Sequence, residues 1–268
     1  MTDINELVSE PGERHIVYGG TRTGKSSFMD WDMRYMQEHR PDGMQLVADT
    51  KPRFRAETIP YGPGNKWRKS AAKEGIYEHW AAGPIVPNSC LIDMRGTTPP
   101  FRGMWNAEDR PGEIAIMQGD EAADWRLMVA LMHHFVARKV KRERRLIVDE
   151  GLDFYQRNTL GIDSKKDPIL RTARAGGERD IGLLLGAHRP HGIPPLLNTL
   201  SSRVSLFHLR LERDMRYLYE MGIPESEGSP QGDYVFQQYK VAPGGTVEGP
   251  WVVRFRYPQS YLAQLSST

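Results

Sequence analysis

The stretch Gly19–Ser26 constrains the fold of this chain more than any other part of the sequence. It reads GGTRTGKS and matches the pattern G-x-x-x-x-G-K-[ST] at every fixed position. The apolar run RHIVY before it is typical of a strand, and after it Phe28, Trp31 and Tyr35 recur at helical spacing. A phosphate-binding loop requires this order of strand, loop and helix. The sequence therefore predicts a loop that holds the phosphates of a nucleotide.

The roles of the loop residues follow from this pattern. The glycines allow successive backbone N–H groups to turn inward around the phosphates, and the helix N-terminus adds partial positive charge. Lys25 is predicted to reach the β and γ phosphates of ATP, and the hydroxyl of Ser26 to bind Mg²⁺. The predicted nucleotide-binding residues are Gly19, Gly20, Thr21, Arg22, Thr23, Gly24, Lys25, Ser26 and Ser27.

A second motif supplies the carboxylates that hydrolysis needs. In LIVDEG, residues 146–151, an apolar strand ends in an aspartate and a glutamate. Asp149 is predicted to join the Mg²⁺ shell, and Glu150 to act as the catalytic base that polarises a water for attack on the γ phosphate. A nucleotide-dependent switch or scaffold has no need of such a base, so Glu150 favours an ATPase.

The remaining pattern predicts an α/β fold, because short apolar runs alternate with amphipathic stretches. We expect a P-loop NTPase of the ASCE, RecA-like class, with a mostly parallel central sheet flanked by helices. Strands are predicted at 14–20, 44–50, 89–95, 113–118, 144–150, 180–190 and 203–209, and helices at 24–40, 121–142, 167–176, 194–202 and 212–222. We expect one domain over residues 1–268, with an irregular insertion at about 52–113 and a C-terminal β-hairpin at about 232–258.

Composition excludes several other kinds of protein. Hydrophobic residues make up 39% of the chain and charged residues 26%, as in ordinary globular proteins. Cys90 is the single cysteine, so no disulfide can form within the chain, and a reducing cytoplasm is expected. No stretch approaches the ~20 apolar residues of a transmembrane helix, and the N-terminal residues lack the pattern of a signal peptide.

Two classes of nucleotide-binding protein do not fit the sequence. A GTPase needs an N/T-K-x-D base reader after a strand, but NKWR lacks the aspartate and SKKD, residues 164–167, follows a polar loop. An ABC-type ATPase needs a Ser-Gly-Gly signature, which SEGSPQGD does not supply.

The stretch RTARAGGERDIGLLLGAHRPHGIPPLLNTLSSRVSLFHL narrows the class. It resembles the DNA-pumping ATPases related to FtsK and HerA, in which an arginine-bearing helix leads to a strand that ends in a polar residue followed by Arg-Pro. The resemblance covers residues 14–50 and 145–222. In this family a glutamine usually ends that strand, lies between the two Walker motifs and senses the γ phosphate. The matching residue here is His188, whose imidazole can also donate to a phosphate oxygen.

The resemblance also implies a homo-oligomeric ring of six subunits. In such rings an arginine of one subunit reaches the phosphate held by its neighbour, where it stabilises charge on the transferring phosphoryl group. Arg174 and Arg179 both lie before the strand, and the alignment does not choose between them. Arg189 and Arg203 resemble family positions too. A surface position or a structural salt bridge explains each of these arginines as well.

The resemblance further implies movement along double-stranded DNA without sequence preference. The net charge of +2 is too small to indicate a nucleic-acid partner, but basic residues cluster at 51–73 and in RKVKRERR at 138–145. Either cluster is equally explained as a solvated face. Trp67, Trp80 and Trp105 lie among basic residues, as in nucleic-acid-binding surfaces, although packing explains them equally well.

A short chain without an anchor resembles the genome-packaging ATPases of tailless, membrane-containing double-stranded DNA viruses. This resemblance implies packaging of DNA into a preformed capsid, capsid or membrane vertex proteins as partners, and a location in the host cytoplasm or with the virion. Two alternatives stay open. One is a plasmid-transfer or mobile-element ATPase of the same superfamily, and the other is an ATP-dependent switch or scaffold that does not move DNA.

Overall fold

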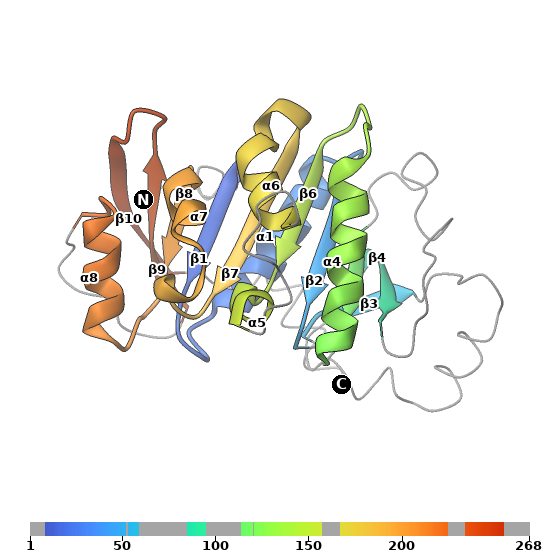
Figure 1. Cartoon of the computed structure of the whole chain (residues 1–268), viewed down its shortest axis with the longest axis horizontal. Coiled ribbons are helices and arrows are strands. Elements are labelled where there is room, and N and C mark those ends of the chain that lie inside the picture. The colour runs from blue at the N-terminus through green and yellow to red at the C-terminus, as the bar shows by residue number, and fades with distance from the viewer. Residues whose placement is uncertain are drawn as a thin grey trace.

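A ten-stranded sheet forms the centre of the computed structural model, which describes residues 9–51, 53–58, 85–94, 114–119, 121–156, 167–224 and 234–254. The strand order is β10-β9-β8-β1-β7-β6-β2-β5-β4-β3 (Figure 1). The strands are β1 (Arg14–Tyr18), β2 (Met44–Asp49), β3 (Arg55–Thr58), β4 (Ile85–Asp93), β5 (Ile114–Gln118), β6 (Arg144–Val148), β7 (Ile181–Ala187), β8 (Arg203–Leu206), β9 (Val235–Val241) and β10 (Val247–Arg254).

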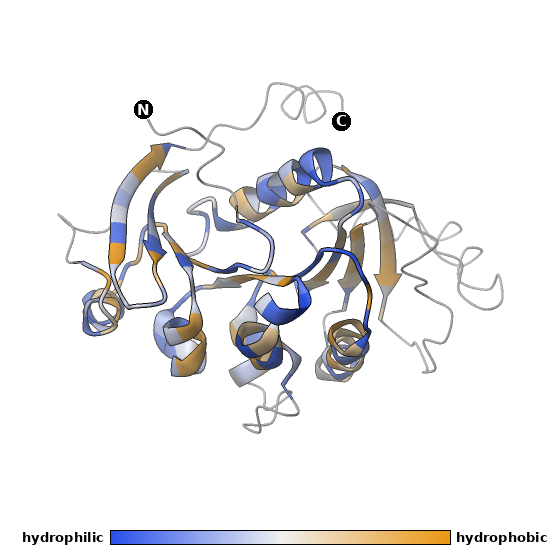
Figure 2. Cartoon of the chain, turned by 90° about the horizontal axis from the view of Figure 1, so that it is seen from above, coloured by the Kyte–Doolittle hydropathy of each residue, from blue (hydrophilic) through white to orange (hydrophobic). Residues whose placement is uncertain are grey.

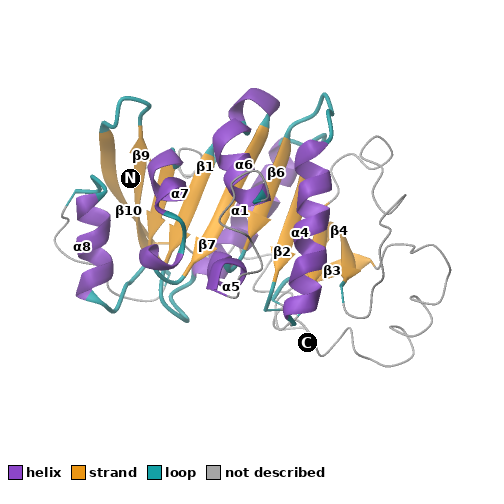
Figure 3. Ribbon diagram, viewed as in Figure 1, coloured by secondary structure: helices purple, strands orange, loops and turns teal. Residues whose placement is uncertain are grey.

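Helices cover both faces of this sheet. Helices α4, α6, α7 and α8 lie on the face toward the viewer in Figure 3, whereas α1 lies behind the strands. The helices are α1 (Lys25–His39), α4 (Ala122–Ala137), α5 (Gly151–Gln156), α6 (Pro168–Ala175), α7 (Pro195–Leu200) and α8 (Glu212–Glu220). Among the residues described, no helix combines the length and apolar character that a membrane crossing needs.

Strands β1 to β8 pair in parallel with their neighbours, and β9 and β10 add an antiparallel hairpin beside β8. The predicted α/β fold and the C-terminal hairpin are therefore confirmed. Strand β7 lies between β1 and β6, the strands that lead into the two nucleotide motifs. Because parallel strands end at the same edge of a sheet, Gly19, Asp149 and His188 follow three adjacent strand ends.

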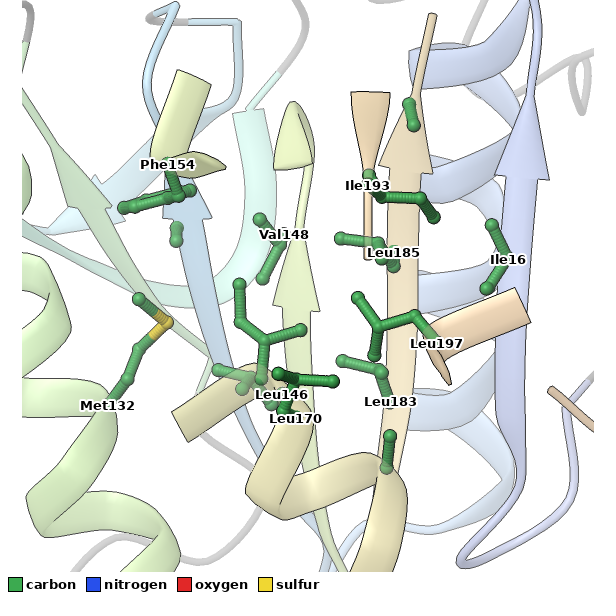
Figure 4. Packing of buried hydrophobic residues seen from close by; sticks show 14 of the residues in the cluster. Ile16, Met132, Leu146, Val148, Phe154, Leu170, Leu183, Leu185, Ile193 and Leu197 are labelled. Atoms are coloured by element: carbon green, nitrogen blue, oxygen red, sulfur yellow. The ribbon is translucent and has the colours of Figure 1, made fainter. Parts of the chain in front are cut away.

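The central strands are apolar throughout because both faces of the sheet are buried. All seven residues of β7 are buried, and their side chains alternate between two cores. Leu183 and Leu185 belong to the core under α4, α6 and α7, where Leu170 and Leu197 also pack (Figure 4), whereas Leu184 belongs to the core under α1. Figure 2 shows the same division, with helices on both sides of the strands.

The insertion differs in part from the expected irregular segment. The strand predicted at 89–95 is β4, which begins earlier at Ile85, and β3 adds a further parallel strand at the sheet edge. Helix α5 is not predicted from the sequence, because its six residues are too few for a periodic apolar pattern. Most of the insertion, including Trp67, Trp80 and Trp105, lies outside the described residues.

Gly186 sits where β7 passes the end of β6, and a side chain there is expected to destabilise the fold. A Cβ atom on Gly186 would lie 2.3 Å from the carbonyl oxygen of Asp149 and 2.9 Å from Sδ of Met29. Since the carbonyl of Asp149 belongs to the backbone and cannot yield without shifting the chain after β6, Gly186→Ala should lower the free energy of unfolding by about 1–3 kcal/mol. Urea denaturation measures this loss. The matched control is Gly177→Ala, because no atom lies within 4 Å of its Cβ position, and an equal loss in both variants would contradict the steric account.

Candidate active site

Two positions of the loop between β1 and α1 require glycine, one because of its backbone conformation and one because of its close neighbours. Gly24, the N-cap residue of α1, has a φ of 103°, which L side chains rarely adopt. A Cβ atom on Gly24 would also lie 2.7 Å from Cδ1 of Tyr234, and one on Gly19 would lie 2.7 Å from Oγ1 of Thr23. The two fixed glycines of the motif are therefore required by conformation and by close approach.

Hydrogen bonds to the neighbouring strand ends hold this loop in place. The N–H of Gly19 donates to the carbonyl of Ala187 at 3.2 Å, and that of Gly20 to the carbonyl of His208 at 3.0 Å. The hydroxyl of Thr23 donates to the carbonyl of Gly20 at 3.0 Å. Helix α1 has no side-chain cap and no acidic residue in its first turn, so its first N–H groups and their partial positive charge face the loop.

A cavity of about 350 Å³ lies over the loop and the start of α1. It contains two long cationic side chains from the motif and one from the end of β2, which suits a polyanion such as a nucleotide triphosphate. All the predicted loop residues line this cavity except Gly19 and Thr23, whose hydrogen bonds to Ala187 and Gly20 hold the loop in place. The lining residues are Gly20, Thr21, Arg22, Gly24, Lys25, Ser26, Ser27, Arg53, His188 and Tyr234.

The residues predicted to hold Mg²⁺ lie side by side. The hydroxyl of Ser26 donates to Oδ1 of Asp149 at 2.9 Å, and Nζ of Lys25 donates to the backbone carbonyl of Asp149 at 3.0 Å. A hydroxyl and a carboxylate are hard oxygen ligands of the kind that Mg²⁺ prefers, and few protein ligands suffice when phosphates complete the shell. The arrangement fits the ion, although the assignment of Ser26 and Asp149 as ligands stays a prediction.

Glu150 is a buried carboxylate on which two lysine ammonium groups and the imidazole of His188 converge. Its Oε2 lies 2.8 Å from Nε2 of His188, 3.6 Å from Nζ of Lys25 and 3.8 Å from Nζ of Lys51. Burial alone would raise the pKa of Glu150, but the His188 hydrogen bond and the charges of Lys25, His188 and Lys51 outweigh it and lower that pKa to about 2. The second oxygen, Oε1, is buried and has no hydrogen-bond partner among the described residues.

His188 connects the loop to Glu150. Its Nδ1 lies 3.1 Å from the carbonyl oxygen of Gly19, and its Nε2 faces Oε2 of Glu150. Both of these oxygens are acceptors when Glu150 is ionised, so each ring nitrogen of His188 faces an acceptor. The side chain lies at the end of β7 and lines the cavity. Its role as a sensor of the γ phosphate stays a prediction.

The arginine candidates lie elsewhere. Arg174, near the end of α6, and Arg179, just before β7, are exposed at the edge of the sheet where the parallel strands begin, opposite the loop. The structure does not bring either to the site of its own chain, and a role toward a neighbouring subunit stays a prediction. Arg203 is buried in a salt bridge to Glu13 at 3.1 Å, which gives it a structural role. Arg189 is exposed beside the loop.

Three further charged residues reach the site from the end of β2. Lys51 and Arg53 are expected from the sequence only as part of a basic cluster, and no role at the nucleotide site is expected for them or for Asp49. Lys51 contacts Glu150, and Arg53 lies 3.6 Å from Oδ2 of Asp149. Oδ2 of Asp49 accepts hydrogen bonds from the backbone N–H groups of Arg53 and Phe54, at 2.7 and 3.0 Å. The only signal in the sequence is an apolar strand that ends in charged residues, and the pairing of β2 with β6 is what brings these residues to the site.

Asp49 is the most perturbed of these groups. It is fully buried, and its pKa is raised to about 7 by burial and by the neighbouring charge of Asp149. The hydrogen bonds from Phe54, Arg53 and the side chain of Gln118 oppose this rise without cancelling it. A second carboxyl group thus lies beside the predicted metal ligand.

Comparison with known proteins identifies the fold. No protein-family model matches the chain, and no curated protein matches its sequence. The DNA-packaging ATPase B204 from Sulfolobus turreted icosahedral virus is similar in structure, with a TM-score of 0.54 and 12% identity over 93% of this chain and 100% of that chain. The genome-packaging NTPase B204 from Sulfolobus turreted icosahedral virus 2, in complex with ATP-gammaS, has a TM-score of 0.54 and 12% identity over 90% and 97% of the two chains. The predicted P-loop NTPase fold, and its likeness to packaging ATPases, is therefore confirmed at the level of structure.

Proposed function

We propose that this chain is an ATPase that uses hydrolysis to move double-stranded DNA. The observation that carries the proposal is a cluster at the edge of the sheet, in which Lys25, Ser26 and His188 line one cavity. These three residues contact the buried carboxylates of Asp149 and Glu150. A protein that only binds a nucleotide needs the phosphate-binding loop but no catalytic base. The buried glutamate beside it, ion-paired with the loop lysine, supports hydrolysis.

In the proposed reaction a water oxygen forms a bond to the γ phosphorus while the bond to the β–γ bridging oxygen breaks. Glu150 accepts the proton that the water gives up, and Lys25 stabilises the negative charge on the phosphate oxygens. Mg²⁺, held through Ser26 and Asp149, would neutralise further phosphate charge when bound.

The contacts of Glu150 support its activation by the substrate. With the His188 hydrogen bond, two lysines nearby and a pKa of about 2, the carboxylate is a weak base. A bound triphosphate competes for Lys25 and His188, since both line the phosphate cavity. As these two groups turn to the phosphates, the basicity of Glu150 rises where the attacking water must lie.

The proposed coupling to DNA rests on the fold. Structures similar to this chain include a genome-packaging NTPase and a DNA-packaging ATPase from two viruses. We propose that six subunits form a ring, that Arg174 or Arg179 reaches the site of a neighbour, and that the ring packages viral DNA in contact with capsid or membrane vertex proteins. Lys51 and Arg53 lie in one of the two basic clusters and contact the active site instead of a distant surface.

ATP hydrolysis with and without double-stranded DNA tests this function. A motor that grips phosphates should be stimulated by DNA of any sequence, and the stimulation should weaken when salt rises from about 50 to about 200 mM. Glu150→Gln serves as the background control, because it should abolish both basal and stimulated turnover. Hydrolysis that is indifferent to DNA at both salt concentrations would overturn the translocase and favour a switch or scaffold.

A further inference from the structure

Tyr234 has an unusual backbone conformation at the start of β9. Its φ is 61°, in the left-handed region that a bulky side chain rarely adopts. About 40% of the residue is exposed, which makes it one of two large hydrophobic residues exposed in the described part of the chain. A strained, exposed aromatic residue indicates a function that the conformation serves, because such strain persists where a site requires it.

The phosphate-binding loop holds Tyr234 in this position. The N–H of Tyr234 donates to the carbonyl of Thr23 at 3.1 Å. Its ring lies so close to Gly24 that a Cβ atom there would approach Cδ1 to 2.7 Å. The aromatic ring therefore rests on the backbone of the loop, and the same residue lines the phosphate cavity.

The strand order shows which end of a bound nucleotide Tyr234 would meet. On one side of β1 lies β7, which places His188 beside Glu150, the group predicted to act at the γ phosphate. On the other side lie β8 and then β9, which is antiparallel to β8 and begins at the edge where β1 and β8 end. A triphosphate whose γ end faces His188 thus runs across the loop toward Tyr234, so that the α phosphate and the nucleoside lie on the Tyr234 side.

We propose that Tyr234 stacks on the base of the bound nucleotide. This inference rests on the proposed ATP site and deepens it. The phosphate-binding loop is predicted to contact only the phosphates of ATP, so the base needs another partner. The exposed phenol ring is flat and apolar, and the other residues that line the cavity include no phenylalanine, tyrosine or tryptophan. Stacking on an aromatic side chain recognises any base by its π face.

Binding of ATP and of inorganic tripolyphosphate, measured by calorimetry on the full chain, separates base recognition from phosphate recognition. Tyr234→Ala should raise the Kd of ATP by about tenfold and leave that of tripolyphosphate unchanged, whereas Tyr234→Phe should bind both as the wild type does. Tyr234→Asn also removes the ring, and it suits the left-handed conformation, so it keeps the test valid if the alanine variant folds poorly.

The outcomes are distinct. Equal weakening of both ligands would show that Tyr234 only braces the loop, and unchanged ATP binding in both ring-less variants would show that the ring does not contact the base. Either result overturns the inference and leaves the ATP site standing. Failure of the wild type to bind either ligand would overturn the nucleotide site itself, and the inference with it.

Discussion

Glu150→Gln is expected to lower the rate of ATP hydrolysis by about 10²–10⁴-fold while ATP binding is retained. The amide cannot accept the proton of the attacking water, yet it fills the same volume beside Lys25 and His188. Because loss of the charge also releases Lys25 from its ion pair, this lysine should be freer to bind phosphate. Single-turnover hydrolysis and equilibrium binding of ATP, measured on the same preparation, check the two halves of the expectation.

Lys25→Met is the matched comparison. In the wild type the ammonium group of Lys25 contacts the carboxylate of Glu150 and lines the phosphate cavity. Loss of this group should therefore weaken ATP binding itself. The two variants should therefore fail in different ways: one binds without turnover and the other does not bind. Near wild-type hydrolysis by Glu150→Gln would remove Glu150 from the role of base and reopen the switch or scaffold.

The candidate site could be predicted from sequence where its residues are contiguous. Gly19–Ser27 and the pair Asp149–Glu150 are short motifs, and their chemistry depends on the local order of strand, loop and helix. The candidate role of His188 came from the family resemblance, because the run LLLGAHRP alone does not predict that β7 lies between β1 and β6. The sheet order supplies that fact.

Residues that depend on strand neighbours could not be assigned in the same way. Asp49 ends an ordinary buried strand and Lys51 follows it, and they reach the site only because β2 pairs with β6. Tyr234 reaches it only because β9 turns back beside β8. For Arg203 the sequence suggested a role that the structure does not support. The residue resembles a family position, but it is buried in a salt bridge with Glu13.

Asp49→Asn is expected to stabilise the chain at pH 8, in contrast to most substitutions of buried polar residues. The folded-state pKa of Asp49 is about 7, compared with 3.8 for an ordinary aspartate. Between these values the folded chain holds a proton that the unfolded chain has lost, so the stabilisation is complete below pH 3.8 and disappears as the pH rises through 7. At about 1.36 kcal/mol per pKa unit, the loss amounts to about 4 kcal/mol at most.

The asparagine variant lacks this titration, and its amide oxygen can still accept from the backbone N–H groups of Arg53 and Phe54. Urea unfolding at pH 5 and pH 8 in the presence of a chelator, which keeps cations from Asp149, measures the effect. The advantage of Asp49→Asn over the wild type should grow with pH, whereas Asp42→Asn, at an exposed carboxylate, should show no such growth. If the free energies of unfolding of Asp49→Asn and the wild type differ by the same amount at both pH values, the carboxyl group of Asp49 is already ionised at pH 5. The hydrogen bonds from Arg53, Phe54 and Gln118 would then outweigh its burial beside Asp149.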